Sequence, residues 1–184
     1  REPGKLRLQV GRAPVELSPA VHEEADDAAL EGGGISATEL ARLIRSKAIS
    51  PVEVLAAHLD AIERANPAIN AIVTLATEQA MDAARAAETA IVKGHAIGPL
   101  HGVPIGIKDI TPTAGIRTTY GSPLYAEHVP EEDAEVVKRL KSAGAIIVGK
   151  TNTPEFATGA NTVNNVFGAT RNPCASAAPQ ASVV

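Results

Sequence analysis

The sequence EEDAEVVKRLKSAGAIIVGK occupies residues 131–150 and decides the class of fold. Its first part, Glu131 to Ser142, places three apolar side chains at the spacing of an amphipathic helix, those of Val136, Val137 and Leu140. Gly144 then ends the helix, and Ala145 to Val148 form an entirely apolar run that predicts a buried strand. A helix that leads through a glycine into a buried strand is typical of α/β proteins, so the sequence predicts an α/β fold.

Capping signals mark the starts of two helices further upstream. Ser36 can accept a hydrogen bond from the first turn of one helix, and Glu39 lies three residues on, where it completes a capping box. Ser50 occupies the same position before a second helix. We expect that second helix to end at Asn66 and Pro67, because the residue before a proline disfavours helical geometry.

A third helix and two strands complete the expected elements. Thr77 to Val92 is rich in alanine and other strong helix formers, and Gly94 supplies its stop. Ile69 to Leu75 and Val103 to Lys108 have the composition of strands. Helices therefore alternate with strands, as the α/β prediction requires.

The length and composition indicate one globular domain or a part of a larger one. The chain has 184 residues, of which 45% are hydrophobic and 21% are charged, close to the average for soluble globular proteins. Residues 1–34 lack periodicity, change from basic to acidic and end in three glycines, so we predict a disordered tail and linker there. We assign residues 35–173 to the domain and residues 174–184 to a divergent or truncated end.

Composition argues against nucleic acids, metals and membranes as partners. Aromatic residues, on which single-stranded nucleic acids stack, make up 2% of the chain, and the net charge is −4. Cys174 is the only cysteine and the five histidines are scattered, so there is no local metal-binding motif. No apolar run reaches the roughly 20 residues of a membrane-spanning helix. We therefore expect a cytoplasmic protein.

Residues 144–151 match a sequence pattern for nucleotide binding. Gly144 and the run Gly149-Lys150-Thr151 satisfy the phosphate-loop pattern G-x-x-x-x-G-K-[ST]. The residues between them, Ala145 to Val148, build a strand rather than a loop, and Pro154 comes too early for the helix that a phosphate loop opens. A nucleotide-binding protein is therefore the third alternative, behind the two classes described below.

Lys108 ends an apolar, glycine-punctuated run, where a lysine is unusual. As an ordinary strand-end residue it would reach water or pair with Asp109. As a catalytic base it would need burial or a neighbouring positive charge, because a lysine that is half neutral at pH 7 has a pKa about 3.4 units below the usual ~10.4. Ile105 and Ile107 are the apolar residues that could surround such a base.

The segment from Thr151 to Asn172 is rich in threonine, asparagine and glycine. These residues favour turns, so the segment is consistent with a plain surface. It is also long for a connection within a compact domain, and long loops often carry function. The residues alone leave both interpretations open.

Three motifs taken together resemble those of the amidase signature family. They are GPLHGVPIGIKD at residues 98–109, GKTNTPEF at residues 149–156 and FGATRNP at residues 167–173. The likeness extends from about Ser36 to Pro173 in consistent order and spacing. It implies a partial amidase-signature fold, α/β with a mixed β-sheet flanked by α-helices, that is truncated before the nucleophile.

The resemblance also implies a chemistry. Family members are amidohydrolases that cleave a carboxamide C–N bond with a Ser-cisSer-Lys triad and need neither a metal nor an organic cofactor. Lys108 matches the family's lysine, whose neutral amine deprotonates a bridging serine, and that serine activates a nucleophilic serine. Phe156, Ala157 and Thr158 are then expected to line the pocket for a small-molecule amide.

The sequence departs from the family pattern after Pro173. Alignment of the last residues places Ser182 at the position of the bridging serine, with Gln180 and Ala181 in place of two glycines. Side chains at those two positions hinder the tight turn that the family's glycines allow. The nucleophilic serine belongs to sequence beyond Val184, so we expect this chain by itself to be an inactive fragment.

Two classes of function are therefore considered first. The leading interpretation is an amidase, although the resemblance selects no particular amide. The alternative is a non-catalytic binding or interaction protein built on the same half-fold. In either case a truncated sheet exposes an unpaired edge and apolar surface, so we expect self-association.

Overall fold

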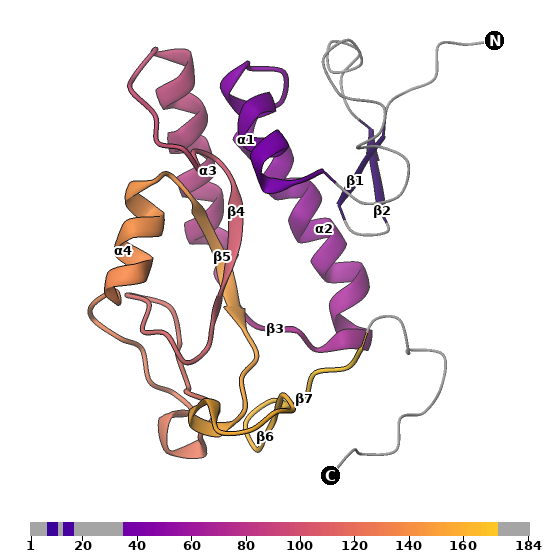
Figure 1. The fold of residues 1–184 in the computed structure, drawn as a ribbon, viewed down its shortest axis with the longest axis vertical. Helices are drawn as coiled ribbons and strands as arrows, with labels where there is room; N and C mark the ends of the chain where they lie inside the picture. The colour runs from indigo at the N-terminus through magenta and orange to yellow at the C-terminus, as the bar shows by residue number, and fades with distance from the viewer. Residues whose placement is uncertain (1–6, 11–12, 17–34, 173–184) are drawn as a thin grey trace, which may run out of the picture. The chain divides into compact units, whose positions relative to one another are not determined.

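Helices alternate with strands along the chain, which confirms the predicted α/β class. The computed structural model describes residues 7–10, 13–16 and 35–172 (Figure 1). The α-helices of these ranges are α1 Ala37–Arg45, α2 Pro51–Ile69, α3 Thr77–Val92 and α4 Glu135–Ser142. The strands are β1 Arg7–Val10, β2 Ala13–Glu16, β3 Ile72–Leu75, β4 Pro104–Lys108, β5 Ile146–Thr151, β6 Val163–Asn164 and β7 Gly168–Ala169. Two 3₁₀ turns lie at Pro123–Tyr125 and Glu155–Ala157.

A three-stranded mixed sheet in the order β3-β5-β4 is the framework of the fold (Figure 1). β3 runs antiparallel to β5. Val103 accepts a hydrogen bond from Ile146 near the start of β4 and β5, and Asp109 donates one to Thr151 near their ends. Pairing therefore advances in the same direction along both strands, so β4 and β5 are parallel. The chain passes between them through α4, because parallel neighbours need a crossover connection.

The chain forms two compact units, each assembled from three separate ranges. The first unit comprises Arg1–Ala61, Thr77–Ile105 and Arg139–Ile147. The second unit comprises Ile62–Ala76, Gly106–Lys138 and Val148–Val184. The chain therefore crosses from one unit to the other within β4 and within β5.

The first unit has an apolar core. Leu43 and Ile44 of α1 are fully buried there, in one cluster with Val54 of α2, Ile91 of α3 and Val103. The α1 residues share one face of the helix because they recur at a spacing of three to four residues. This burial, rather than intrinsic helix propensity, is what stabilises so short a helix.

The predicted capping box at Ser36 and the predicted cap at Ser50 have different outcomes. Ser36 caps α1, since its hydroxyl accepts the Glu39 N–H at 3.1 Å, but the Glu39 carboxylate accepts hydrogen bonds from Arg42 rather than reaching back to Ser36. Ser50 forms the complete box before α2. Its hydroxyl accepts the Glu53 N–H at 3.1 Å, and the Glu53 carboxylate accepts the Ser50 N–H at 2.9 Å.

Weakening of this box should be measurable in the stability of the chain. Replacing Ser50 with alanine removes the hydroxyl that accepts the Glu53 N–H and leaves the backbone N–H that donates to the Glu53 carboxylate, so we expect the free energy of unfolding to fall by about 1 kcal/mol. Urea denaturation followed by far-UV circular dichroism measures the change. Ser142→Ala, at the exposed end of α4, is the matched control and should change stability by less than about 0.5 kcal/mol. Equal effects of the two substitutions would show that the box is not stabilising.

The predicted end of α2 is wrong by one turn. The helix continues through Pro67 to Ile69, and Asn70 ends it with a φ of 54°. Pro67 is tolerated because the helix has only two more residues to form. The Asn66 side chain accepts the N–H of Ile72 at 2.8 Å and donates to the carbonyl of Ile72 at the same distance, so it caps this end. β3 consequently begins at Ile72 rather than at the predicted Ile69.

α4 also begins later than the sequence predicts, at Glu135 rather than Glu131. The preceding residues are engaged elsewhere, since the Asp133 carboxylate accepts the N–H of Ala114 at 2.8 Å. Of the predicted apolar face, Val137 is fully buried, whereas Val136 is 55% exposed. These tertiary contacts, rather than local periodicity, decide where the helix starts.

The segment predicted to be a disordered tail contains two described strands. β1 and β2 pair antiparallel, with Leu8 opposite Val15. The other residues of 1–34, and residues 173–184, lie outside the described residues. The assignment of a tail and of a divergent end therefore stays a prediction.

Candidate active site

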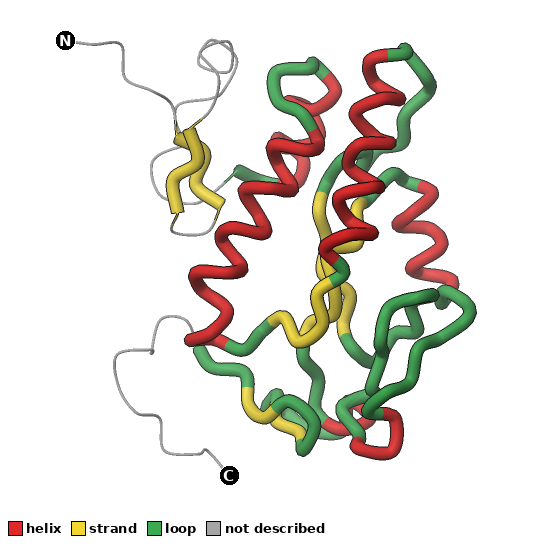
Figure 2. Tube along the Cα trace, turned by 180° about the vertical axis from the view of Figure 1, so that it is seen from behind, coloured by secondary structure: helices red, strands yellow, loops and turns green. Residues whose placement is uncertain are grey.

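The second unit buries polar as well as apolar side chains, whereas the buried side chains described in the first unit are all apolar. Nine polar or charged residues are buried in the described part of the chain, and all belong to this unit: Asp109, Thr113, Thr118, Thr119, Ser122, Lys150, Asn152, Thr153 and Asn164. Five of them lie on the segment between β4 and α4, most of which is loop in Figure 2. Buried polar groups cost free energy unless they are hydrogen-bonded. We therefore expect most of these nine side chains to form specific hydrogen bonds.

Lys108 is the last residue of β4, and its side chain is exposed. Within the described residues that side chain has no hydrogen bond or ion pair. The peptide group that follows it is held at both of its polar atoms, because the Lys108 carbonyl accepts the Thr111 N–H at 2.9 Å and the Asp109 N–H donates to Thr151 at 2.8 Å. Ile107 is buried, but the described residues leave the amine of Lys108 exposed, whereas the hypothesis of a desolvated base expects it to be buried.

Asp109 is not the ion-pair partner of Lys108 that the alternative interpretation expects. Its carboxylate is fully buried and accepts both the hydroxyl and the N–H of Thr119, the latter at 3.1 Å. Its carbonyl accepts the N–H of Tyr120 at 3.0 Å. Burial raises the pKa of Asp109, while the hydrogen bonds from Thr119 act in the opposite direction. Asp109 thus ties the end of β4 to the turn at residues 119–121.

Lys150 of β5 heads the fully buried side chains of the described residues when these are ranked by volume. Its ammonium donates to the carbonyl of Thr111, to the hydroxyl of Thr113 at 3.0 Å and to the hydroxyl of Thr118 at 2.9 Å. Burial lowers the pKa of Lys150 to about 8. The motifs of the sequence do not identify this role, although a lysine within an apolar strand is a signal for it.

The geometry makes Lys150 a structural cation rather than a base. A protonated lysine has three N–H donors and no acceptor, and three oxygens receive them here. A pKa of about 8 also leaves most of the amine protonated at pH 7. Because Lys150 is buried in a strand that runs to Thr151, the prediction of a strand in place of a phosphate loop is confirmed.

The lowered pKa of Lys150 predicts a defined pH dependence of stability. Between pH about 8 and 10.5 the unfolded chain holds the Lys150 proton and the folded chain releases it, so this residue's contribution to the free energy of unfolding rises with pH. This pH-dependent gain is lost as the pH falls through about 8, below which both states hold the proton. Urea denaturation across this window should therefore show a steeper rise for the parent chain than for Lys150→Met. Parallel profiles of the parent chain and Lys150→Met would show that folding does not lower the pKa of Lys150.

The three predicted pocket residues lie together after β5. Phe156, Ala157 and Thr158 are exposed, and the first two have φ values of 48° and 58°, in the left-handed region that residues with side chains rarely adopt. The Phe156 N–H donates to the carbonyl of Tyr120 at 2.8 Å. The Phe156 ring meets the Tyr125 ring edge to face, with 6.2 Å between the centroids. Phe156 therefore contacts the turn that the buried aspartate anchors.

The segment rich in threonine and asparagine is not a plain surface. Asn152 and Asn164 are buried, and the Asn164 amide donates to the Asn152 side chain at 2.7 Å and to the Thr153 carbonyl at 2.8 Å. The Asn152 amide in turn donates to the hydroxyl of Thr170 at 3.1 Å. These contacts join the end of β5 to the β6–β7 hairpin.

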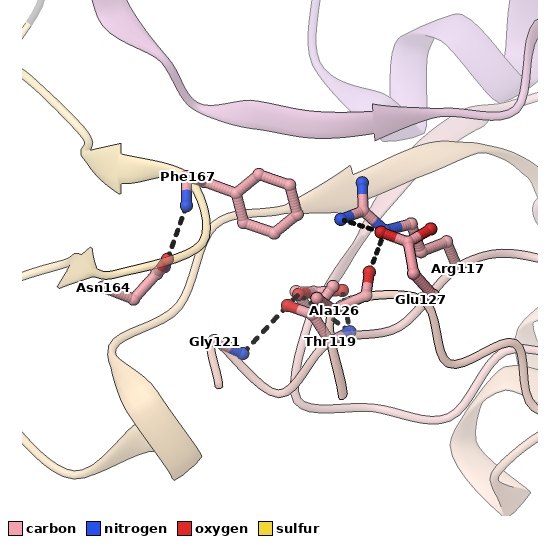
Figure 3. Close-up of polar contacts among 8 residues, drawn as sticks. Arg117, Thr119, Gly121, Ala126, Glu127, Asn164 and Phe167 are labelled. Atoms are coloured by element: carbon pink, nitrogen blue, oxygen red, sulfur yellow. Dashed lines mark hydrogen bonds and ion pairs between the residues drawn. The ribbon is translucent and has the colours of Figure 1, made fainter. Parts of the chain in front are cut away.

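Arg117 joins the same hairpin to the loop after β4. Its guanidinium lies over the ring of Phe167, 5.2 Å from the centroid, and 3.5 Å from the Glu127 carboxylate (Figure 3). Its Nε also donates to the carbonyl of Ala126. The Phe167 N–H donates to the Asn164 side chain at 2.8 Å, as Figure 3 shows. The cation–π contact thus joins the loop to the hairpin, and polar contacts within the loop and within the hairpin hold its two partners in place.

Other predicted features lie outside these contacts. Ser182, the expected bridging serine, and Cys174 lie outside the described residues. Among residues 7–10, 13–16 and 35–172, no group of three or more His, Cys, Asp or Glu side chains is arranged to hold a metal ion. No helix of those ranges has both the length and the apolar character needed to cross a bilayer.

Comparison with known proteins gives consistent matches. A family model described as Amidase matches residues 53–178. The A subunit of glutamyl-tRNA(Gln) amidotransferase from Carboxydothermus hydrogenoformans is 48% identical over 139 residues, which are 76% of this chain and 29% of that protein. The protein of the same name from Acidothermus cellulolyticus is 44% identical over 138 residues, 75% of this chain and 27% of its own length. The chain thus spans less than a third of these curated relatives.

Solved structures show the same partial coverage. A bacterial aryl acylamidase of the amidase signature family matches with a TM-score of 0.71 and 33% identity, over 76% of this chain and 29% of its own. Fatty acid amide hydrolase matches with a TM-score of 0.70 and 27% identity, over 76% of this chain and 25% of its own. The predicted partial fold, with a mixed sheet and flanking helices, is therefore confirmed.

Proposed function

Because the chain belongs to the amidase family, we propose that it carries the lysine-bearing part of an amide-hydrolysing site, with Lys108 as the base. The position of Lys108 is the observation that carries the proposal. It ends β4, the peptide group that follows it is hydrogen-bonded at both of its polar atoms, and its exposed amine is available to a serine from another part of the domain. Lys150 is unsuited to this role, because its three donors are already engaged.

In the proposed reaction a Ser-cisSer-Lys triad hydrolyses the amide. Once the serine-bearing part of a longer product covers Lys108 and shields it from water, its neutral amine takes a proton from the bridging serine, which takes one from the nucleophilic serine as that oxygen attacks the carbonyl carbon. Backbone N–H groups stabilise the oxyanion, the proton passes to the leaving amine, and water then releases the acid from the acyl-enzyme. We assign Ser182 to the bridging position, and the reaction requires neither a metal nor an organic cofactor.

The substrate in this proposal is a small-molecule amide that contacts Phe156, Ala157 and Thr158. The exposure of these residues, and the contact of Phe156 with Tyr120 and Tyr125 in the loop after β4, support the assignment. The relatives are named as part of a tRNA amidotransferase, as an aryl acylamidase and as a fatty acid amide hydrolase, and these names share only the amide group. A cytoplasmic location and the lack of nucleic-acid contact by this chain belong to the same proposal.

We assign no turnover to the 184-residue chain by itself. It spans less than a third of its relatives, and the reaction needs a nucleophilic serine that the family resemblance places beyond Val184. The activity therefore belongs to a longer product that adds the serine-bearing segment.

The test compares the 184-residue chain with a product of the encoding gene that reads past Val184 through a serine-bearing segment. Release of ammonia or amine is measured from aliphatic amides, aryl amides and glutamine. We expect turnover by the longer product only. Turnover by the 184-residue chain that depends on Lys108 would overturn the fragment proposal. A gene that lacks such a segment would favour the alternative, a non-catalytic binding protein on the same half-fold.

The sheet also supports self-association of the 184-residue chain. β3 and β4 are the outer strands of the described three-stranded sheet, and Leu124 and Val136 are large apolar side chains with exposures of 86% and 55%. We expect size-exclusion chromatography with light scattering to show oligomers whose share grows with concentration. A sharp monomer peak at every concentration, together with cooperative melting, would exclude self-association.

A further inference from the structure

We propose that Lys150 is a positioning residue for Lys108. Its buried ammonium holds the loop that follows Lys108 and so sets the direction in which the Lys108 side chain leaves β4. The proposal rests on the function proposed above, in which Lys108 is the base, but it concerns a different residue on a different strand.

Two hydrogen bonds connect the two lysines through one residue. The Lys150 ammonium donates to the carbonyl of Thr111, and the N–H of Thr111 donates to the carbonyl of Lys108 at 2.9 Å. The side chain of Lys108 has no partner of its own in the described residues, so only its backbone orients it. A movement of Thr111 therefore changes the starting direction of the Lys108 side chain.

The loop after β4 depends on such contacts because it has little regular structure. Between β4 and α4 the described elements include only the short 3₁₀ turn at Pro123–Tyr125, so no helix or strand ladder holds residues 109–122. Backbone groups buried in an irregular segment need polar partners from elsewhere. Lys150 supplies such a partner from the neighbouring strand and binds the loop at three places.

The chemistry of the three acceptors selects an ammonium group. The Thr113 hydroxyl donates to the carbonyl of Thr111 at 3.1 Å, and the Thr118 hydroxyl donates to the carbonyl of Ile116 at 3.0 Å. Each hydroxyl has thus used its only donor and can offer only lone pairs to Lys150. A side chain with three donors and no acceptor satisfies both hydroxyls and the carbonyl at once, and lysine is that side chain.

The carboxylate of Asp109 also holds the loop after β4. Asp109 follows Lys108 directly, is fully buried, and binds Thr119 of the same loop. The loop is therefore held by one buried anion at its start and by one buried cation from β5. Catalysis is sensitive to such placement, because a displacement of about 1 Å in a reacting group can lower a rate by about 100-fold.

The test observes Lys108 directly in the 184-residue chain with ¹³C-labelled lysine. The ε-methylene resonance of Lys108 and its rate of acetylation by limiting acetic anhydride are compared in the parent chain and in Lys150→Met. We expect the resonance to shift or broaden and the rate to change at least twofold, while the methyl signals of the α1 and α2 core stay unchanged. Lys93→Met, which removes an exposed lysine after α3, is the control and should leave both readouts unchanged.

Two isosteric variants keep the test decisive if Lys150→Met fails to fold. Thr113→Val and Thr118→Val each remove one acceptor and leave the lysine in place, so each should shift the Lys108 resonance in the same direction by a smaller amount. If folded variants lose stability while the Lys108 resonance and acetylation rate remain those of the parent, Lys150 stabilises the loop without positioning Lys108, and the proposal is wrong. The resonance and the acetylation rate are measured without turnover, so they test this proposal independently of the proposed function.

In an active longer product, Lys150→Met should lower kcat and leave KM unchanged.

Discussion

Replacing Lys150 with alanine is expected to lower the free energy of unfolding of the 184-residue chain by about 3–5 kcal/mol. Alanine leaves a cavity in place of a fully buried lysine side chain and removes three hydrogen bonds in one step. It also leaves the buried carboxylate of Asp109 without the positive charge of Lys150. Because a domain is typically stable by only about 5–15 kcal/mol, urea denaturation at pH 7 should show the loss plainly.

Two further variants separate the causes of this loss. Lys150→Met keeps most of the volume and removes the charge, and we expect a smaller loss than for alanine, because methionine leaves no large cavity. Lys138→Ala alters a lysine that is 54% exposed and should change stability by less than about 0.5 kcal/mol. An alanine variant at Lys150 as stable as the parent would show that the buried ammonium does not stabilise the fold.

Replacing Lys108 with methionine should abolish catalysis without affecting stability. In the longer product defined above we expect kcat/KM to fall by about 1000-fold or more, because the relay loses the group that receives the first proton. In the 184-residue chain we expect the free energy of unfolding to stay within about 0.5 kcal/mol of the parent, because the Lys108 side chain is exposed. Initial rates on the best amide of the panel and urea denaturation measure the two effects.

The control for this variant is Lys93→Met in the same longer product. Lys93 is exposed after α3 in the first unit, so its loss should change neither activity nor stability. Undiminished amide cleavage by Lys108→Met would remove Lys108 from the reaction. A loss of stability equal to that of Lys150→Ala would instead show that the Lys108 side chain has a structural role.

The sequence predicts well the helix boundaries that are set by interactions between residues close together along the chain. α3 spans the predicted residues Thr77–Val92, because strong helix formers fill it and Gly94 follows with a φ of 70°. The start of α2 agrees for the same reason, since the capping box at Ser50 involves residues only three apart. The end of α2 and the start of α4 differ from the prediction because the Asn66 cap and the Asp133 contact involve backbone groups farther away.

For the site, the sequence by itself determined the family resemblance, the α/β class and the candidate residues Lys108, Phe156, Ala157 and Thr158. Those conclusions rest on the order and spacing of short motifs, which are properties of the chain before it folds. Only the tertiary structure decided that Lys108 is exposed and that Lys150 is the buried lysine. The partners of Lys150 lie 32 to 39 residues away along the chain, so no local pattern encodes them. Burial and three simultaneous hydrogen bonds arise only once β5 and the loop after β4 have packed together.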